Sequence, residues 1–457
     1  MKRIIMSILF FAIFMQSVVF AQIQFSVPLS KIASDAILGC RGLGCIPSYS
    51  YPDMVTIEEA DFMSDSELVL GVNLDGIQKA YPLSTLWFHE IGNDKINDFY
   101  YTVSYCPLTR TGILFNAKQR GKVIEYGVSG FLYNNNLIMY DRTNSPDYSF
   151  FPQMYFTGIT EPRFGEQLEM WPLVMSTWKA WKMIYPNTLV VASNLRGSIF
   201  PYGDYNENDD NILFPQEVDS RRRAKEMVFG VINSNFRARA YPFEDMEPSA
   251  IINDFFDDKR IAIFFDDESK LAVGFDRGSV EGYDALEFEL SSKPRITEFA
   301  RDRQTGSVWN ILGKAVGGPL VGSQLHQLEK AYSGFWFAWA AYFKPIEIYS
   351  PTTDVDDNDP ILSLPQSYGL DQNFPNPFNP VTTIRYFFPQ AEEVTINIYN
   401  LNGQLIRNLV SESKNAGYHE IVWDAKDNGG KILSSGVYLY GIQAGAFTEV
   451  KKLTLLR

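Results

Sequence analysis

Five short motifs occur twice in this chain of 457 residues, in the same order and 158 to 161 residues apart. Ordered self-similarity at a nearly constant offset indicates an internal duplication. The sequence therefore predicts a core of two homologous halves, at 55–200 and 225–349, joined by a solvated connecting loop at 201–224. The paired motifs are VLGV (69–72) with VFGV (228–231), AYP (80–82) with AYP (240–242), IGND (91–94) with IIND (251–254), DR (141–142) with DR (302–303), and WKAW (178–181) with WFAW (336–339).

The predicted halves consist mainly of strands. Stretches rich in β-branched and aromatic residues lie at 68–73 and 100–105 in the first half and at 227–232 and 260–265 in the second. Each half then ends in a helix-like segment whose aromatic residues recur every three or four positions. Both halves keep this stripe, which favours core packing over a planar ligand. Because no long helices alternate with the strands, we expect a mainly β fold with short helices (α+β), and not a doubly wound α/β sheet.

The N-terminus predicts export. Lys2 and Arg3 precede an apolar run, and small residues lead to a cut after Ala21, so residues 1–21 are expected to be a signal peptide. An N-terminal arm at 22–54 follows. Later segments never reach 18 consecutive apolar residues, so we expect no transmembrane segment in the mature protein. The net charge of −14, without a long basic stretch, argues against nucleic acid as a partner.

An acidic linker at 350–366 separates the core from a tail at 367–457. Residues 354–359 resemble the start of a calcium loop, but Pro360 follows and no Glu stands at the twelfth position. A charged linker is therefore favoured over a calcium site. In the tail, apolar and polar residues alternate as in half-buried strands, and Asn-Gly dipeptides mark turns, so we expect an independent β-sandwich.

The chain has three cysteines, and export places them in an oxidising compartment. The segment between Cys40 and Cys45 is short and rich in glycine, so it can turn tightly enough for a disulfide. Two free thiols in a flexible arm are the alternative. Because three is an odd number, at most one intramolecular disulfide forms and one thiol is left over.

The tail resembles a known export signal. The motifs that carry the resemblance are NFPNPFNP (373–380), TIRY (383–386), GQ (403–404), WD (423–424) and SGVY (435–438). They are similar to the type A sorting domain of the type IX secretion system, which has an immunoglobulin-like fold. The resemblance implies passage through the periplasm, recognition by the type IX secretion machinery, and a secreted or outer-membrane surface location.

The core resembles the bacterial family known as domain of unknown function 3179. The motifs are AYPL (80–83), WFHE (87–90), YCPL (105–108), SG (129–130), YDR (140–142), WNILG (309–313) and FWFAW (335–339). The family brings no activity, cofactor or substrate with it. Many members have a second cysteine three residues after the first, where this chain has Thr109, and this difference weakens a Cys-x-x-Cys redox interpretation.

Three reactive residues of the first half are candidates for a site: His89, Glu90 and Cys106. Their equivalents 160 residues later are Ser249, Ala250 and Asp266. The second half thus keeps the scaffold without the imidazole or the thiol. Pro107 breaks the hydrogen-bond ladder after Cys106, and strand ends of this kind reach clefts. We expect any site to join His89 to Cys106, with a thiol pKa lowered by the imidazole.

Three function classes remain open for these residues. His89 and Cys106 suit a metal or redox site, with Glu90, Met139 or Met154 completing the ligands. Alternatively, Cys106 is a nucleophile activated by His89. The class that we favour is a non-catalytic surface or binding module, in which Cys106 is a buried apolar thiol.

Other polar residues are expected to be structural. The DR pairs at 141–142 and 302–303 recur in both halves, which favours structural ion pairs over a site. His326 and His419 lie in different domains without neighbours of ligand type, so we expect ordinary surface or sheet roles.

Overall fold

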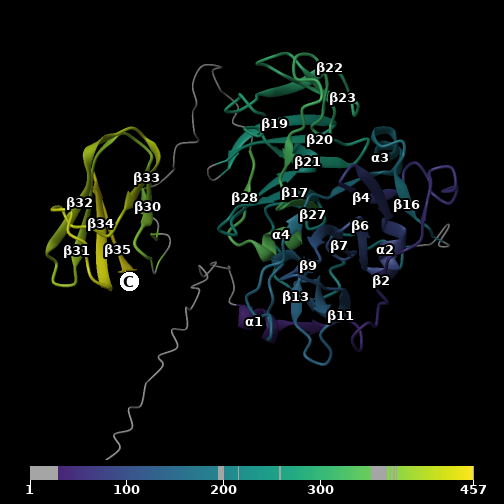
Figure 1. The fold of residues 1–457 in the computed structure, drawn as a ribbon, viewed down its shortest axis with the longest axis horizontal. Helices are drawn as coiled ribbons and strands as arrows, with labels where there is room; N and C mark the ends of the chain where they lie inside the picture. The colour runs from purple at the N-terminus through teal and green to yellow at the C-terminus, as the bar shows by residue number, and fades with distance from the viewer. Residues whose placement is uncertain are drawn as a thin grey trace, which may run out of the picture. The chain divides into compact units, whose positions relative to one another are not determined.

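The computed structural model describes residues 29–193, 200–214, 216–256, 259–350, 368–370, 372–373, 376 and 378–455. It divides into a core unit, within Gln24–Pro351, and a tail unit, within Thr352–Arg457, and each is described by itself (Figure 1). The predicted signal peptide at 1–21 and the acidic stretch at 354–359 lie outside the described residues. The described part is mainly β with short helices, as predicted.

Three sheets and a small hairpin, β9–β10, make up the first part of the core. In strand order the sheets are β15-β4-β5-β16-β3, β14-β8-β7-β6-β2 and β1-β11-β12-β13. Their strands are β1 (Ile37–Leu38), β2 (Tyr49–Ser50), β3 (Met54–Val55), β4 (Leu68–Leu74), β5 (Ile77–Pro82), β6 (Ile91–Ile96), β7 (Phe99–Cys106), β8 (Thr111–Asn116), β9 (Lys118–Gln119), β10 (Lys122–Val123), β11 (Tyr126–Tyr133), β12 (Asn136–Asp141), β13 (Phe150–Pro152), β14 (Met170–Trp171), β15 (Val174–Thr177) and β16 (Leu189–Val191). The strands predicted at 68–73 and 100–105 correspond to β4 and β7.

The second part of the core also has three sheets, ordered β27-β17-β18-β28, β19-β20-β21-β26 and β22-β23-β24-β25. Their strands are β17 (Met227–Ile232), β18 (Ala238–Pro242), β19 (Ser249–Phe256), β20 (Lys259–Asp266), β21 (Leu271–Asp276), β22 (Phe288–Arg295), β23 (Glu298–Asp302), β24 (Val308–Trp309), β25 (Ala315–Gly317), β26 (His326–Gln327), β27 (Ala331–Phe335) and β28 (Glu347–Ile348). In both parts a hairpin is flanked by one antiparallel strand and one parallel strand: β4–β5 by β15 and β16, and β17–β18 by β27 and β28.

The short helices of the core are α1 (Leu29–Asp35), α2 (Leu83–His89), α3 (Trp178–Ile184) and α4 (Trp336–Tyr342), with 3-10 turns η1 (Gln153–Tyr155) and η2 (Phe243–Asp245). The tryptophans of α3 and α4 are buried, so the aromatic stripes belong to the core as predicted. A glycine lies under one ring of each helix. A Cβ added to Gly71 would lie 2.3 Å from the Trp181 ring, and one added to Gly230 would lie 2.3 Å from the Trp339 ring.

The two parts of the core are interlocked. The backbone N–H of Thr177, just before α3, donates to the Ser269 carbonyl of the second part at 2.8 Å. In return, the N–H of Phe335, just before α4, donates to the Thr109 carbonyl of the first part at 2.9 Å. The side chains of α3 share a hydrophobic cluster with second-part residues such as Phe264. In return, Tyr342 of α4 packs on Tyr155 of the first part, with 4.6 Å between ring centroids.

The recurring DR pairs do not form ion pairs between neighbours. Asp141 pairs with Arg163 at 3.3 Å, whereas Arg142 turns to Glu125. In the second part, buried Asp302 accepts hydrogen bonds instead, including one from the Trp309 indole at 2.9 Å. The residues are structural, as predicted, but their partners come from elsewhere in the chain.

The tail unit consists of two sheets, β29-β30-β33 and β32-β31-β34-β35, whose inward side chains share one hydrophobic cluster. The strands are β29 (Gly369–Leu370), β30 (Thr382–Phe388), β31 (Glu392–Asn400), β32 (Leu405–Lys414), β33 (Gly417–Trp423), β34 (Gly436–Ala444) and β35 (Phe447–Leu455). The alternation predicted for Val394, Ile396 and Ile398 is confirmed, because all three are buried along β31 while their neighbours are more exposed.

Candidate functional site

His89 ends helix α2 and faces the N-terminal arm. Its Nδ1 lies 2.7 Å from the Pro47 carbonyl oxygen, and its ring meets the Tyr49 ring edge-on at 5.3 Å between centroids. The side chain is half-buried. None of the contacts described for His89 involves Cys106, so the structure does not bring the expected pair together.

Cys106 is the last residue of β7 and is the free cysteine of the described chain. Its side chain is 1% exposed, and its Sγ donates to the Asn135 carbonyl at 3.5 Å. Burial, and next the nearby Glu90 carboxyl, raise the pKa of the thiol to about 11. The expectation of a lowered thiol pKa is therefore wrong. An apolar surrounding disfavours the thiolate, and no imidazole stands close enough to offset that cost.

Glu90 is the more unusual group. Its backbone lies in the left-handed region, with φ of 54°, and caps α2 by donating to the Leu86 carbonyl at 2.8 Å. The side chain is 5% exposed, and burial raises the pKa of its carboxyl to about 8. Within the described ranges no side chain or backbone group is hydrogen-bonded to this carboxyl. A buried acid without a partner and in a strained backbone is typical of a functional site.

Predicted metal ligands do not converge within the described part of the chain. No group of three or more His, Cys, Asp or Glu side chains there could hold a metal ion. Met139 and Met154, the other ligands considered, are fully buried hydrophobic residues of the core. His326 is exposed on β26, and His419 stacks on Phe388 in the tail, so both have the ordinary roles that we expected.

The connecting segment at 201–224 is exposed along much of its length, but a few of its residues pack against the first part of the core. Tyr205 is fully buried, and its hydroxyl donates to the Leu108 carbonyl at 3.0 Å. Asn135 and Phe214 form a reciprocal pair, in which the Asn135 amide donates at 2.9 Å and its oxygen accepts at 3.0 Å. We call residues 200–214 the cover, because Tyr205 bonds to Leu108, two residues after Cys106, and Phe214 bonds to Asn135, whose carbonyl accepts from the Cys106 thiol.

A buried lysine holds the cover in shape. Lys225 is 5% exposed, and its ammonium donates to the carbonyls of Tyr205, Asn208 and Asn211. The same ammonium lies 3.3 Å from the centroid of the Tyr205 ring. Burial lowers the pKa of Lys225 to about 8. The conformation of the cover is therefore stabilised by the buried Lys225 ammonium.

Aromatic rings connect α2 to the cover. Trp87 meets Phe200 at 5.0 Å between centroids, Phe200 meets Tyr202 at 5.5 Å, and Tyr202 meets Tyr205 at 6.2 Å. Both Glu90 and Cys106 contribute, after burial, to raising the pKa of Tyr202. None of these cover residues was among the site candidates predicted from the sequence, although the aromatic spacing at 200–205 within a polar connector is a visible signal.

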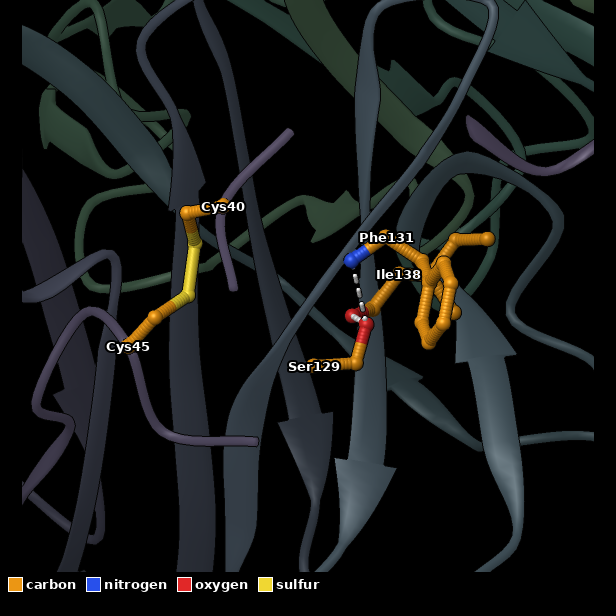
Figure 2. Close-up of a disulfide and its surroundings, with 5 residues drawn as sticks. All are labelled: Cys40, Cys45, Ser129, Phe131 and Ile138. Atoms are coloured by element: carbon orange, nitrogen blue, oxygen red, sulfur yellow. Dashed lines mark hydrogen bonds between the residues drawn. A yellow bond between two sulfur atoms is a disulfide. The ribbon is translucent and has the colours of Figure 1, made fainter. Parts of the chain in front are cut away.

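The predicted disulfide between Cys40 and Cys45 is present and lies against β11 (Figure 2). Gly39 and Cys40 both donate their N–H groups to the Gly130 carbonyl, at 2.8 and 3.2 Å. Gly130 has a φ of 82°, and a Cβ at this position would lie 2.5 Å from the Cys40 carbonyl oxygen. The Ser129–Gly130 motif therefore serves to seat the disulfide loop.

The comparisons with known proteins agree with this division of the chain. A family model described as "Protein of unknown function (DUF3179)" matches residues 43–346, in one match across both parts of the core. The chain belongs to this family. A second family model, described as "FlgD Ig-like domain", matches residues 381–446 of the tail. No curated protein matches the chain.

Solved structures show only a distant likeness. FlgD from P. aeruginosa is 23% identical, with 16% of this chain and 58% of that chain covered and a TM-score of 0.14. Dimeric latent PorU from Porphyromonas gingivalis is 14% identical, with 92% and 34% covered and a TM-score of 0.18. PorZ, a type-IX secretion surface component from the same organism, is 12% identical, with 80% and 51% covered and a TM-score of 0.15. The chain covers less than two thirds of each protein, and likenesses at such TM-scores carry no argument.

In this DUF3179 member, Thr109 belongs to a buried polar network behind Cys106. The Thr109 and Thr111 hydroxyls lie 2.9 Å apart, and Thr111 donates to the Gln153 amide oxygen at 2.7 Å. Asn136 donates to Thr109 at 2.9 Å and to Gln153 at 2.8 Å. The Thr109 hydroxyl is therefore part of the hydrogen-bonded core of the first part.

None of the helices that the structure describes is long and apolar enough to cross a membrane.

Proposed function

We propose that this DUF3179 protein is exported and acts at the cell surface or outside the cell. The signal peptide expected at 1–21 directs it to the periplasm, and the tail serves as a type A sorting domain for the type IX secretion machinery. The match of residues 381–446 to the FlgD Ig-like family supports an immunoglobulin-like sandwich for the tail, and the sorting motifs at 373–380 support its role.

We also propose that the core arose by duplication. Its support is the shared strand order, with the same antiparallel and parallel neighbours around each hairpin. Specific contacts recur at an offset near 160 as well. The Tyr81 hydroxyl donates to Asp94 at 2.6 Å, and the Tyr241 hydroxyl donates to Asp254 at the same distance. Likewise, the Asn93 side chain bonds to the backbone of Tyr126, and the Asn253 side chain bonds to the backbone of Phe288.

For the core, we propose a non-catalytic binding module with one site, formed by Glu90 and Cys106 beneath the cover. The observation that carries this proposal is Glu90, because burying a carboxyl without a partner costs free energy and does nothing for packing. Cys106 stays a neutral thiol at physiological pH, since its pKa is raised to about 11. A neutral thiol is a poor nucleophile, so the geometry does not favour the cysteine-nucleophile class.

Alkylation of Cys106 tests the proposed site. In the full mature chain we expect slow reaction with iodoacetamide at pH 7.5 and no change of rate with His89→Ala. Tyr205→Ala removes the ring and the hydroxyl bond to Leu108, so it should expose the thiol and raise the rate at least tenfold. Tyr283→Ala, at a partly buried tyrosine of the second part, is the matched control and should have no effect.

Two results would contradict the proposal. A wild-type thiol as reactive as in the urea-unfolded chain would show that the cover does not close over Cys106. A fast reaction that His89→Ala abolishes would restore the activated nucleophile.

A further inference from the structure

The unpaired carboxyl of Glu90 calls for a positive partner. Carboxylates buried in proteins are nearly always paired with a cation or a set of donors, because an isolated charge is too costly. No ion pair to Glu90 exists among the described residues, and burial favours the protonated form of its carboxyl. A cation that reached this position would replace that proton.

The described cationic side chains nearest to Glu90 already have other contacts. Lys225 directs its ammonium to three backbone carbonyls of the cover and to the Tyr205 ring. Arg110 lies at the β7–β8 turn with its guanidinium carbon 5.9 Å from the centroid of the Phe335 ring. His89 is hydrogen-bonded toward the N-terminal arm. None of these described groups forms an ion pair with Glu90.

A chain of aromatic rings leads from α2 to the cover. Trp87 lies three residues before Glu90, Phe200 of the cover packs on the Trp87 ring, and Tyr202 packs on Phe200. The Glu90 carboxyl contributes to raising the pKa of Tyr202, so this ring lies close to Glu90. Faces of such rings attract alkylammonium and guanidinium groups through their quadrupoles. The cover already uses this attraction once, where Lys225 sits on the Tyr205 ring at 3.3 Å.

We propose, resting on the binding site proposed above, that its ligand carries an organic cation, such as an alkylammonium group, held by the Glu90 carboxylate and the rings of Trp87 and Tyr202. The cation enters as the Glu90 proton leaves to solvent, so the net charge of the site does not change. The Cys106 thiol stays protonated and lines the site without binding the cation. The cover has to open for entry, and the Tyr205–Leu108 and Asn135–Phe214 hydrogen bonds are the contacts that release.

This exchange predicts a specific pH dependence. Below pH 8 the site must give up one proton per cation bound, so affinity rises up to tenfold per pH unit and levels off above about pH 8. Raised pKa values keep Cys106 and Tyr105 on β7, and Tyr202 and Tyr205 on the cover, in their protonated forms over pH 6 to 7.5. Lys225 under the cover has a pKa lowered to about 8, so it begins to lose its proton at the upper end of this range, and proton release is therefore measured at pH 6.5. The other ionisable side chains beside the site are His89 on α2 and Arg110 on the β7–β8 turn.

Isothermal titration calorimetry of the full mature chain tests the proposal with choline and its uncharged isostere 3,3-dimethylbutan-1-ol. Two buffers of different ionisation enthalpy report the proton. We expect choline to bind at least tenfold more tightly than the isostere, with nearly one proton released at pH 6.5. Glu90→Gln should lower choline affinity at least tenfold and abolish proton release. Tyr202→Leu should weaken binding several-fold and keep the proton release.

Glu67→Gln is the control, because Glu67 is a partly buried acid that accepts a hydrogen bond from Ser84 elsewhere in the first part. It should leave choline binding unchanged. Equal affinity for choline and the isostere would overturn the cation proposal but leave a binding site beneath the cover. Binding of neither compound at any pH would also overturn the cation proposal, and the alkylation experiment then judges the site separately.

Discussion

Replacing Glu90 with Gln should stabilise the protein, and the gain should grow with pH. Gln keeps the shape of the side chain but cannot ionise. The folded state holds the Glu90 carboxyl in its protonated form up to a pKa of about 8, whereas the reference value for an exposed glutamate is 4.5. Between these values the unfolded chain releases a proton that the folded chain retains.

The sign and size follow from linkage. The pKa of Glu90 is higher in the folded chain than in the unfolded chain, so its protonation stabilises the folded state fully at low pH. This contribution to the free energy of unfolding is lost as the pH rises from 4.5 to about 8. Each unit of that window is worth about 1.4 kcal/mol. Relative to the wild type, Glu90→Gln should therefore add nothing near pH 4, about 3 kcal/mol at pH 7, and no further gain above pH 8.

Urea unfolding of both proteins at unit steps from pH 4 to pH 9 measures this difference. Glu161→Gln, at an exposed position of the same part of the core, controls for the change in net charge and should leave the curve unchanged. A difference between wild type and Glu90→Gln that stays constant from pH 4 to pH 8 would refute the argument, since Glu90 would then ionise alike in both states.

Three other perturbations test separate parts of the structure. Gly71→Ala and Gly230→Ala each place a methyl group against a buried tryptophan ring, so each should lower the free energy of unfolding by about 1–3 kcal/mol, measured in urea. Clearly unequal losses in the two variants would weaken the duplication proposal. Lys225→Met leaves three cover carbonyls without their donor and should speed proteolysis within 200–214; unchanged cleavage would show that the lysine does not hold the cover. Deleting 367–457 should leave a soluble core trapped in the periplasm, whereas arrival of the truncated protein at the cell surface would contradict the sorting role.

Local patterns in the sequence predicted the elements but not their long-range contacts. Strands such as β4 and β7 follow directly from runs of β-branched and aromatic residues, and the disulfide follows from a short glycine-rich loop. The aromatic residues at 200–205 were a local sign that part of the connector is buried, but they could not show where it packs, since Tyr205 meets Leu108 across 97 residues of chain. The polar composition of this segment predicted that it is exposed to solvent. In the structure, the Lys225 ammonium supplies hydrogen-bond donors to its backbone carbonyls.

The candidate site was predicted in its members but not in its geometry. Glu90 and Cys106 do come together, while His89, one residue earlier, points to the N-terminal arm. The reason is the left-handed backbone of Glu90, which ends α2 and turns the chain abruptly. A sequence shows that two reactive residues are adjacent, but the turn between them decides which side each faces.

The second part of the core shows that the scaffold does not require the polar site. Cys106 pairs with Thr111 in the β7–β8 ladder, and the equivalent pair in β20–β21 is Asp266 with Leu271. At the position of buried Ser104 the second part has Phe264, which is equally buried. Under the proposed duplication, apolar Phe264 and Leu271 therefore replace Ser104 and Thr111, whereas Asp266 at the position of Cys106 is polar and accepts hydrogen bonds from Ser249 and Ser269. The second part thus forms the same ladder without the buried thiol and with fewer buried donors to satisfy, which is consistent with a binding role for the first part alone.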